Sequence, residues 1–130
     1  MLKNARLFYK VKILKATIIY LLKSLTLVEC FINYFKKNNI NPNECLFYTY
    51  WFSESTFGLV LLKKVFPEIK IITRAHAIDL YEEMHPFNYI PFRKQGVQNI
   101  DMIAPCMNAG ANYFADRYGL NNSSIRVINN

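Results

Sequence analysis

A histidine closes a β-rich run near the middle of the chain, in the stretch IITRAHAIDLYEE at residues 71–83. An imidazole titrates near neutral pH, so His76 is suited to general acid–base catalysis or to hydrogen bonding with a sugar or a phosphate. Asp79 follows three residues later, where it can orient the imidazole or cap the next turn. The alternative is a structural histidine that is buried and satisfied at the end of a strand. We take His76 as the candidate catalytic residue.

Side-chain types that bind metals also gather in this stretch. They are His76, Asp79, Glu82, Glu83 and His85. Their spacing matches neither HExxH nor a zinc-finger pair, so we expect no metal site, and we expect the two glutamates to form a solvated face. The chain contains neither GxGxxG nor GxxxxGK[ST], so no motif supports dinucleotide or nucleoside triphosphate binding, and we expect no bound cofactor.

Other apolar runs of the sequence also end in side chains that can contact a ligand. If these runs are parallel strands of one sheet, their carboxyl ends share the edge at which ligands bind. An aromatic ring and a side-chain amide follow two of the runs, and two arginines are suited to holding an anion, although they can equally be exposed. The candidate substrate-binding residues are Arg74, Asp79, Arg93, Trp51 and Asn108.

The elements that position these side chains alternate along the chain. Apolar, aromatic-rich runs predict strands at 45–51, 69–73, 100–105 and 124–128, and helices are predicted at 53–66, at 108–119 and briefly after Pro91. The residues from Ser53 to Thr56 offer N-cap candidates for the first of these helices, Asn108 is the expected N-cap of the second, and Gly119 is its expected C-terminal stop. The alternation predicts an α/β fold: a Rossmann-like, open parallel sheet with flanking helices and both faces covered.

A long amphipathic, basic helix is predicted over residues 1–40, followed by the alternating part at 45–130 in a single domain. Its apolar residues recur at steps of three and four, which places them on one side of a helix that we expect to pack on the sheet. A helix lying on a membrane surface is the alternative. The stripe consists of Leu7, Val11, Leu14, Ile18, Leu21, Leu25, Val28, Ile32 and Phe35.

Charge is distributed unevenly. The net charge is +7, and the first helix carries Lys3, Arg6, Lys10, Lys12, Lys15 and Lys23. Such asymmetry indicates an anionic partner, and because no helix-turn-helix, RRM or zinc motif is present, an anionic membrane surface is favoured over nucleic acid. Three cysteines without a CxxC motif favour reduced thiols in a cytosolic protein. We therefore expect a cytoplasmic protein that can be peripheral at the inner face of the membrane.

The region from Tyr48 to Val127 carries a combination of motifs that resembles a known enzyme family. The chain has YTYW at 48–51, RAHAIDLYEE at 74–83, IPFR at 90–93 and IDMIAPCMNAGANYFADRYG at 100–119. This order and spacing resemble the N-terminal half of family-4, GT-B-type bacterial glycosyltransferases, most closely those that build exopolysaccharides and surface glycans. The resemblance covers roughly the last three-fifths of the chain.

The resemblance implies a retaining transfer of a sugar from a nucleotide-sugar to a glycan or lipid-linked acceptor, without a metal. In that family the corresponding histidine faces the cleft between two domains, near the transferred sugar, and this role would carry over to His76. The conserved aspartate and the two arginines would correspond to Asp79, Arg74 and Arg93. The nucleotide-sugar would be held mainly by a second domain.

Departures from the family pattern shape what we expect of the chain by itself. Ala77 replaces a glycine, Asn108 stands near an expected serine, and neither the donor domain nor the usual opening strands are recognisable. We therefore expect a truncated, acceptor-side portion that is inactive alone, because catalysis needs both substrates held in register. The alternative is a non-catalytic module that binds a membrane or another protein through its basic first helix.

Overall fold

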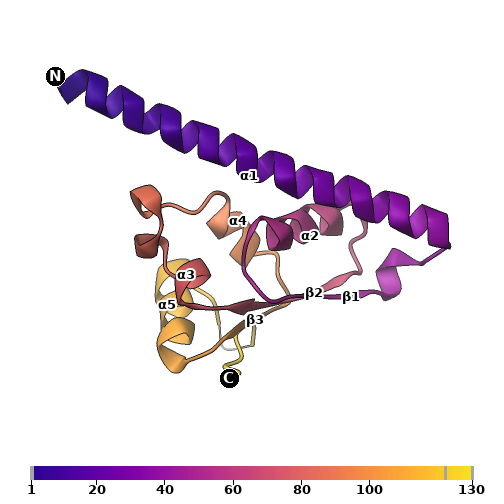
Figure 1. Ribbon diagram of the computed structural model, residues 1–130. Helices are drawn as coiled ribbons and strands as arrows, with labels where there is room; N and C mark the ends of the chain where they lie inside the picture. Colours follow the sequence, from indigo (N-terminus) through magenta and orange to yellow (C-terminus); the bar gives the residue numbers. More distant parts are fainter. Residues whose placement is uncertain (1, 122, 130) are drawn as a thin grey trace.

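A computed structural model describes residues 2–121 and 123–129, with side chains described from Tyr9 onward. Its centre is an open sheet of three parallel strands in the order β1-β2-β3 (Figure 1). In register, Leu46 pairs with Lys70, and Ile72 pairs with Met102. The predicted α/β, Rossmann-like fold class is confirmed. The strands are β1 (Leu46–Thr49), β2 (Lys70–Ala75) and β3 (Met102–Pro105).

Helices connect and flank these strands. The predicted helices are confirmed, including the short one after Pro91. The helices are α1 (Leu2–Asn38), α2 (Glu54–Val65), α3 (Ala77–Leu80), α4 (Arg93–Val97) and α5 (Asn108–Tyr118), with 3-10 turns η1 (Pro42–Glu44), η2 (Glu82–Met84) and η3 (Pro86–Asn88). The short helix α3 and the 3-10 turns were not predicted. Of the predicted N-cap candidates, Ser53 caps α2 by accepting a hydrogen bond from Ser55 N–H. Gly119 ends α5 in the left-handed conformation, with a φ of 68°.

The core lies between the sheet and α2, and α1 crosses over α2 on the outside (Figure 1). A glycine permits this close approach of the two helices. A Cβ on Gly58 would lie 2.7 Å from Leu27 Cδ2 and 2.9 Å from the backbone oxygen of Ser24. The Ser24 hydroxyl lies 2.9 Å from the carbonyl oxygen of Glu54, which ties the middle of α1 to the start of α2.

One face of β1 is not covered by helices in the described chain, so the prediction of two covered faces is wrong for this strand. Phe47 and Ile71 pack into the core, whereas Leu46 is 64% exposed and Tyr48 is 56% exposed. The prediction failed because apolar and aromatic residues occur on both faces of this strand, so the sequence did not show which face is exposed. The alternating burial shows that β1 behaves like a strand of a one-sided sheet.

Two predictions near the C-terminus need correction. The segment predicted as a fourth strand forms only an isolated parallel bridge, between Ile125 and Ile103. It follows β3 through a few backbone hydrogen bonds, such as that from Arg126 N to Ile103 O at 3.0 Å. Asn108 is the first residue of α5 and not its cap, because the extended N-cap position belongs to Met107.

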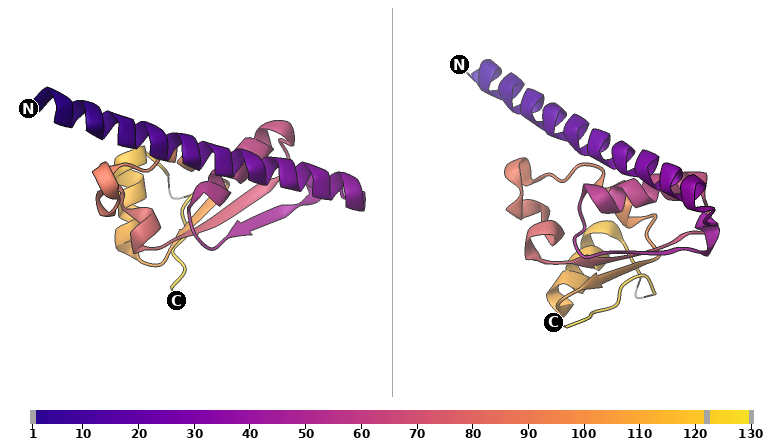
Figure 2. Two further views of the ribbon diagram at one scale, coloured as in Figure 1. Left: turned by 45° about the horizontal axis from the view of Figure 1, so that its top comes forward. Right: turned by 45° about the vertical axis from the view of Figure 1, so that its right-hand side comes forward.

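The apolar stripe predicted for α1 is divided between two environments. Its second half includes Phe35, which is buried, but Val11, Leu14, Ile18 and Leu25 are each 46–59% exposed. Figure 2 shows that the N-terminal half of α1 extends beyond the sheet and α2, so Val11, Leu14 and Ile18 have less to pack against. Leu25 follows the buried Ser24 but lies on the side of α1 that faces away from α2. The side chains of Lys3, Arg6 and Leu7 lie outside the described residues. Over the described residues, no helix combines the length and apolar character needed to cross a bilayer.

Candidate functional site

His76 sits at the carboxyl end of β2, where the backbone turns into α3. Its ring lies against two aromatic rings from the segment after β1: the centroid distances are 4.6 Å to Tyr50 and 4.5 Å to Trp51. Both ring nitrogens are shielded from solvent, and neither makes a hydrogen bond to the described residues, although the side chain faces the backbone N–H of Asp79 in a capping-box arrangement. A buried polar atom without a partner costs about 1–3 kcal/mol. An imidazole left in this state at the ligand-binding edge of a parallel sheet is a candidate contact for a substrate.

Asp79 organises the backbone around His76. The carboxylate is buried, and its two oxygens accept hydrogen bonds from the backbone N–H of His76, at 2.7 Å, and from the backbone N–H of Phe52. The nearest imidazole nitrogen is 4.0 Å from the carboxylate, which is too far for a hydrogen bond. Asp79 therefore joins the segment after β1 to the turn after β2 and fixes where Trp51 meets His76.

Arg93 reinforces the same junction from α4. Its guanidinium is buried, with 3% of the residue exposed, and donates to the carbonyl oxygens of Phe52 and Asp79 at 3.1 and 2.6 Å. It also lies over the Phe52 ring, 3.9 Å from the centroid. Burial lowers the pKa of Arg93 below its ordinary value, and the nearby Tyr20, Tyr118 and Asp79 act in the opposite direction. These contacts give Arg93 a structural role, and its role in substrate binding stays a prediction.

A group of threonine hydroxyls fixes the backbone of Trp51. Thr56, in the first turn of α2, donates to the carbonyl oxygen of Trp51 at 2.9 Å. Its oxygen is 2.8 Å from the hydroxyl of Thr49 in β1, which is in turn 2.7 Å from the hydroxyl of Thr73 in β2. The backbone of Trp51 is thereby fixed while its side chain stays 48% exposed. The result is a firmly placed aromatic residue whose ring is half open to solvent.

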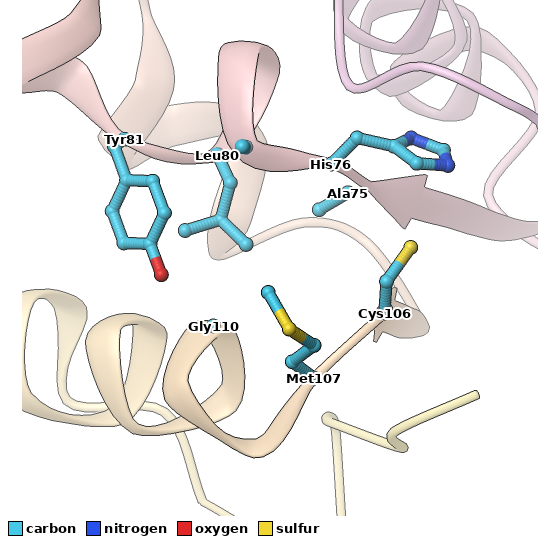
Figure 3. A pocket seen from close by; sticks show the side chains of 8 residues that line it. Ala75, His76, Leu80, Tyr81, Cys106, Met107 and Gly110 are labelled. Atoms are coloured by element: carbon cyan, nitrogen blue, oxygen red, sulfur yellow. The ribbon is translucent and has the colours of Figure 1, made fainter. Parts of the chain in front are cut away.

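The third strand brings a cysteine to the same edge. Cys106 follows β3, and in Figure 3 its sulfur points toward the side of the sheet edge that carries His76. Arg74 donates from Nη2 to Cys106 Sγ at 3.1 Å and to the carbonyl oxygen of Ile128 at 2.8 Å. The hydrogen bond to the sulfur is the main cause of a raised pKa for the Arg74 guanidinium. Sequence reasoning missed this pair because the two residues are neighbours only through the pairing of β2 with β3.

Two hollows adjoin His76 and Asp79. The first, drawn in Figure 3, has a volume of about 20 Å³ and is lined by His76, Leu80, Cys106 and Met107 among others. It has room for about one water molecule. The second has a volume of about 320 Å³, and its walls include Trp51, Asp79 and Arg93. The larger hollow has the size range in which proteins hold small ligands.

The candidate residues therefore do not all meet in one place. Trp51, His76 and Arg74 gather at the carboxyl edge of the sheet, and Asp79 and Arg93 lie behind them as supports. Asn108 is an exposed residue that lines neither hollow. Tyr50, which contacts His76, was not predicted as a site residue. Its position next to Trp51, after β1, could have identified it as a site residue.

The acidic cluster after α3 is structural in the described chain, and the prediction of a solvated face is wrong for Glu82. Its carboxylate accepts hydrogen bonds from Tyr118, at 2.6 Å, and from Arg117, which ties η2 to α5. Glu83 is exposed and accepts from Tyr113 at 2.9 Å. Within the described residues, no three His, Cys, Asp or Glu side chains come close enough together to hold a metal ion.

Comparison with protein-family models and with curated proteins finds no match for this chain.

Proposed function

We propose that this chain forms the acceptor-side part of a retaining glycosyltransferase site, in which His76 contacts the sugar. The observation that carries the proposal is the imidazole of His76, with two unpartnered nitrogens, lying under Tyr50 and Trp51 at the carboxyl edge of β2. Sugar hydroxyls are suitable partners, since each can donate or accept a hydrogen bond. The motif resemblance supports the same reading.

Aromatic rings suit the same ligand class. Tyr50 and Trp51 are each about half exposed, at 51% and 48%. The C–H-rich face of a pyranose packs against such rings while its hydroxyls stay free for polar contacts. In the present arrangement the two rings cover the imidazole, so a sugar would displace at least one of them to reach a His76 nitrogen. Binding should then change the environment of Trp51.

Charge and fold support an acceptor-side role. Arg74 holds a guanidinium at the same edge through Cys106 and Ile128, where it could face the phosphate of a lipid-linked acceptor or of the donor. The nucleotide of the donor would be held mainly by a second domain facing this edge. We expect no cofactor and no metal, and we expect no sugar transfer by these 130 residues alone, because both substrates must be held together.

The single tryptophan provides a direct test. Trp51 fluorescence would be recorded while the protein is titrated with methyl glucoside, methyl galactoside and methyl mannoside, and separately with uridine diphosphate. We expect at least one sugar to change the emission and the nucleotide to have no effect. The response should be lost in His76→Ala and Tyr50→Ala. It should persist in Tyr34→Ala, which removes a similarly exposed tyrosine from α1.

Three results would overturn the proposal. They are a tryptophan signal that no sugar changes, a response to uridine diphosphate alone, and a sugar response that survives in His76→Ala. A companion assay would mix the protein with radiolabelled nucleotide-sugars and the responding glycoside. Sugar transfer by the purified chain would refute the expectation that it is inactive alone.

A further inference from the structure

The outward side of α1 carries a continuous apolar strip that the fold leaves exposed. We name it the outer stripe and define it as Val11, Leu14, Ile18, Leu22 and Leu25. Each of its side chains is 46–59% exposed. Steps of three and four residues keep the five side chains on one side of the helix, over a length of about 20 Å. Single exposed apolar residues are ordinary, but a row of five large ones indicates a contact surface.

Contacts on the opposite side of α1 fix the direction in which the outer stripe faces. Tyr9 donates to the carbonyl oxygen of Phe87 at 3.2 Å, and their rings pack edge to face with centroids 4.6 Å apart. Ser24 and Phe35 are buried against the body of the protein. Figures 1 and 2 show no other element of the described chain over the outer side of α1. The outer stripe, from Val11 to Leu25, therefore faces away from the rest of the described chain.

The charges beside the outer stripe identify the kind of partner. Lys10, Lys12 and Lys15 are exposed around its N-terminal half, and Glu29 is the only acidic residue of α1. Lys23 is also exposed and pairs with Glu54 at 3.0 Å. Two copies of this helix would bring lysines together with few acids to balance them, which disfavours self-association. A partner with an apolar interior and a negatively charged surface complements both the apolar outer stripe and the lysines beside it.

We propose that the outer stripe docks on a membrane surface that contains anionic lipid, with α1 lying in the plane of the interface. The five apolar side chains would enter the boundary between headgroups and acyl chains. The lysine stems would lie along that boundary with their ammonium groups at the lipid phosphates. This surface is distinct from the edge that carries His76, and the proposal does not depend on sugar transfer.

Vesicle co-sedimentation tests the proposal on the full chain. Vesicles of phosphatidylcholine alone would be compared with vesicles containing three parts phosphatidylglycerol in ten, at low and high salt. We expect binding to the anionic vesicles that weakens with salt. The double variant Leu14→Ser/Leu22→Ser should bind at least about tenfold more weakly, since each leucine loses apolar burial. Lys12→Gln/Lys15→Gln should lose about fivefold per lysine at low salt.

Control variants distinguish binding through the outer stripe from nonspecific binding through other exposed apolar side chains. Leu46→Ser/Val65→Ser removes two side chains that are 64% and 54% exposed on other surfaces, and it should bind like the unmodified chain. Circular dichroism should show the same helix content in all variants. The proposal is overturned by an unmodified chain that does not bind anionic vesicles, or by equal losses in the control variant. It is also overturned by a dimer in sedimentation velocity that Leu14→Ser/Leu22→Ser dissociates.

Discussion

Replacing the Asp79 carboxylate with an amide is the sharpest test of how the candidate site is held together. Asp79→Asn preserves shape and volume but leaves one acceptor oxygen where two backbone N–H groups, of Phe52 and His76, now point. The second N–H group would face an NH₂ donor in a position where only 6% of the residue is exposed. The structure therefore predicts a large loss of stability from a substitution of nearly constant size.

The magnitude follows from the two hydrogen bonds. A hydrogen bond to a charged acceptor contributes about 1.5–3 kcal/mol, and a buried donor left without a partner costs about 1–3 kcal/mol. We expect Asp79→Asn to lower the free energy of unfolding by about 3 kcal/mol, a large share of the roughly 5–15 kcal/mol typical of a domain. With a urea dependence of about 1.5 kcal/mol per molar, the unfolding midpoint should fall by about 2 M.

Urea unfolding followed by the fluorescence of Trp51, and in parallel by circular dichroism, measures this change. Asp116→Asn is the matched control, because it makes the same chemical change at an exposed position of α5. The control should stay within about 0.5 kcal/mol of the unmodified chain. If Asp79→Asn were equally mild, the carboxylate would not be what links the turn after β1 to the turn after β2.

Two further predictions concern the sheet and the helix contact. Burial acts to raise the pKa of Asp101, but hydrogen bonds from Lys63 Nζ and from the backbone N–H of Ile71, together with nearby lysine charge, lower it below its ordinary value. A carboxylate with a lowered folded-state pKa stabilises the protein above its unfolded pKa of about 3.9, and the stabilisation is lost as the pH falls through the folded value. Asp101→Asn should therefore cost about 1–2 kcal/mol in urea unfolding at pH 7 and much less at pH 3, and an equal cost at both pH values would contradict this origin. Gly58→Ala should cost about 1–3 kcal/mol because the new methyl group meets the α1 backbone, whereas Gly119→Ala meets no neighbour and should cost only about 1 kcal/mol from its left-handed φ. Thermal melts that reverse this order would show that α1 and α2 are not in close contact.

Local signals predicted most of the secondary structure. Ser53 before an apolar helix and Gly119 after another are position-specific, because only a cap geometry uses them in this way. The face that α1 buries was not predictable from its own sequence. Its three-four spacing runs through Leu14 and Phe35 alike, and which residues are covered depends on how far α2 and the sheet extend and on which side of α1 faces them.

The candidate site was predicted in part, for a related reason. His76 and Trp51 were recognisable because each follows a strand, and the parallel order of the strands brings them to one edge. Arg93 follows Phe92 in a left-handed conformation, and no local pattern indicates that its guanidinium turns inward to bind two carbonyl oxygens. Contacts of this kind depend on residues far away in the chain, so composition and periodicity do not reveal them.

The carboxylate of Asp79 also has a consequence for motion. The carboxylate accepts hydrogen bonds from the backbone N–H groups of Phe52 and His76, so two amides that are far apart in sequence depend on the same side chain. When the Asp79 side chain moves away, both N–H groups lose their acceptor together, so opening through this side chain should expose both amide protons to solvent exchange. The segment that carries Tyr50 and Trp51 and the turn that carries His76 would then open together. A ligand that binds at either segment would slow amide hydrogen exchange at both Phe52 and His76.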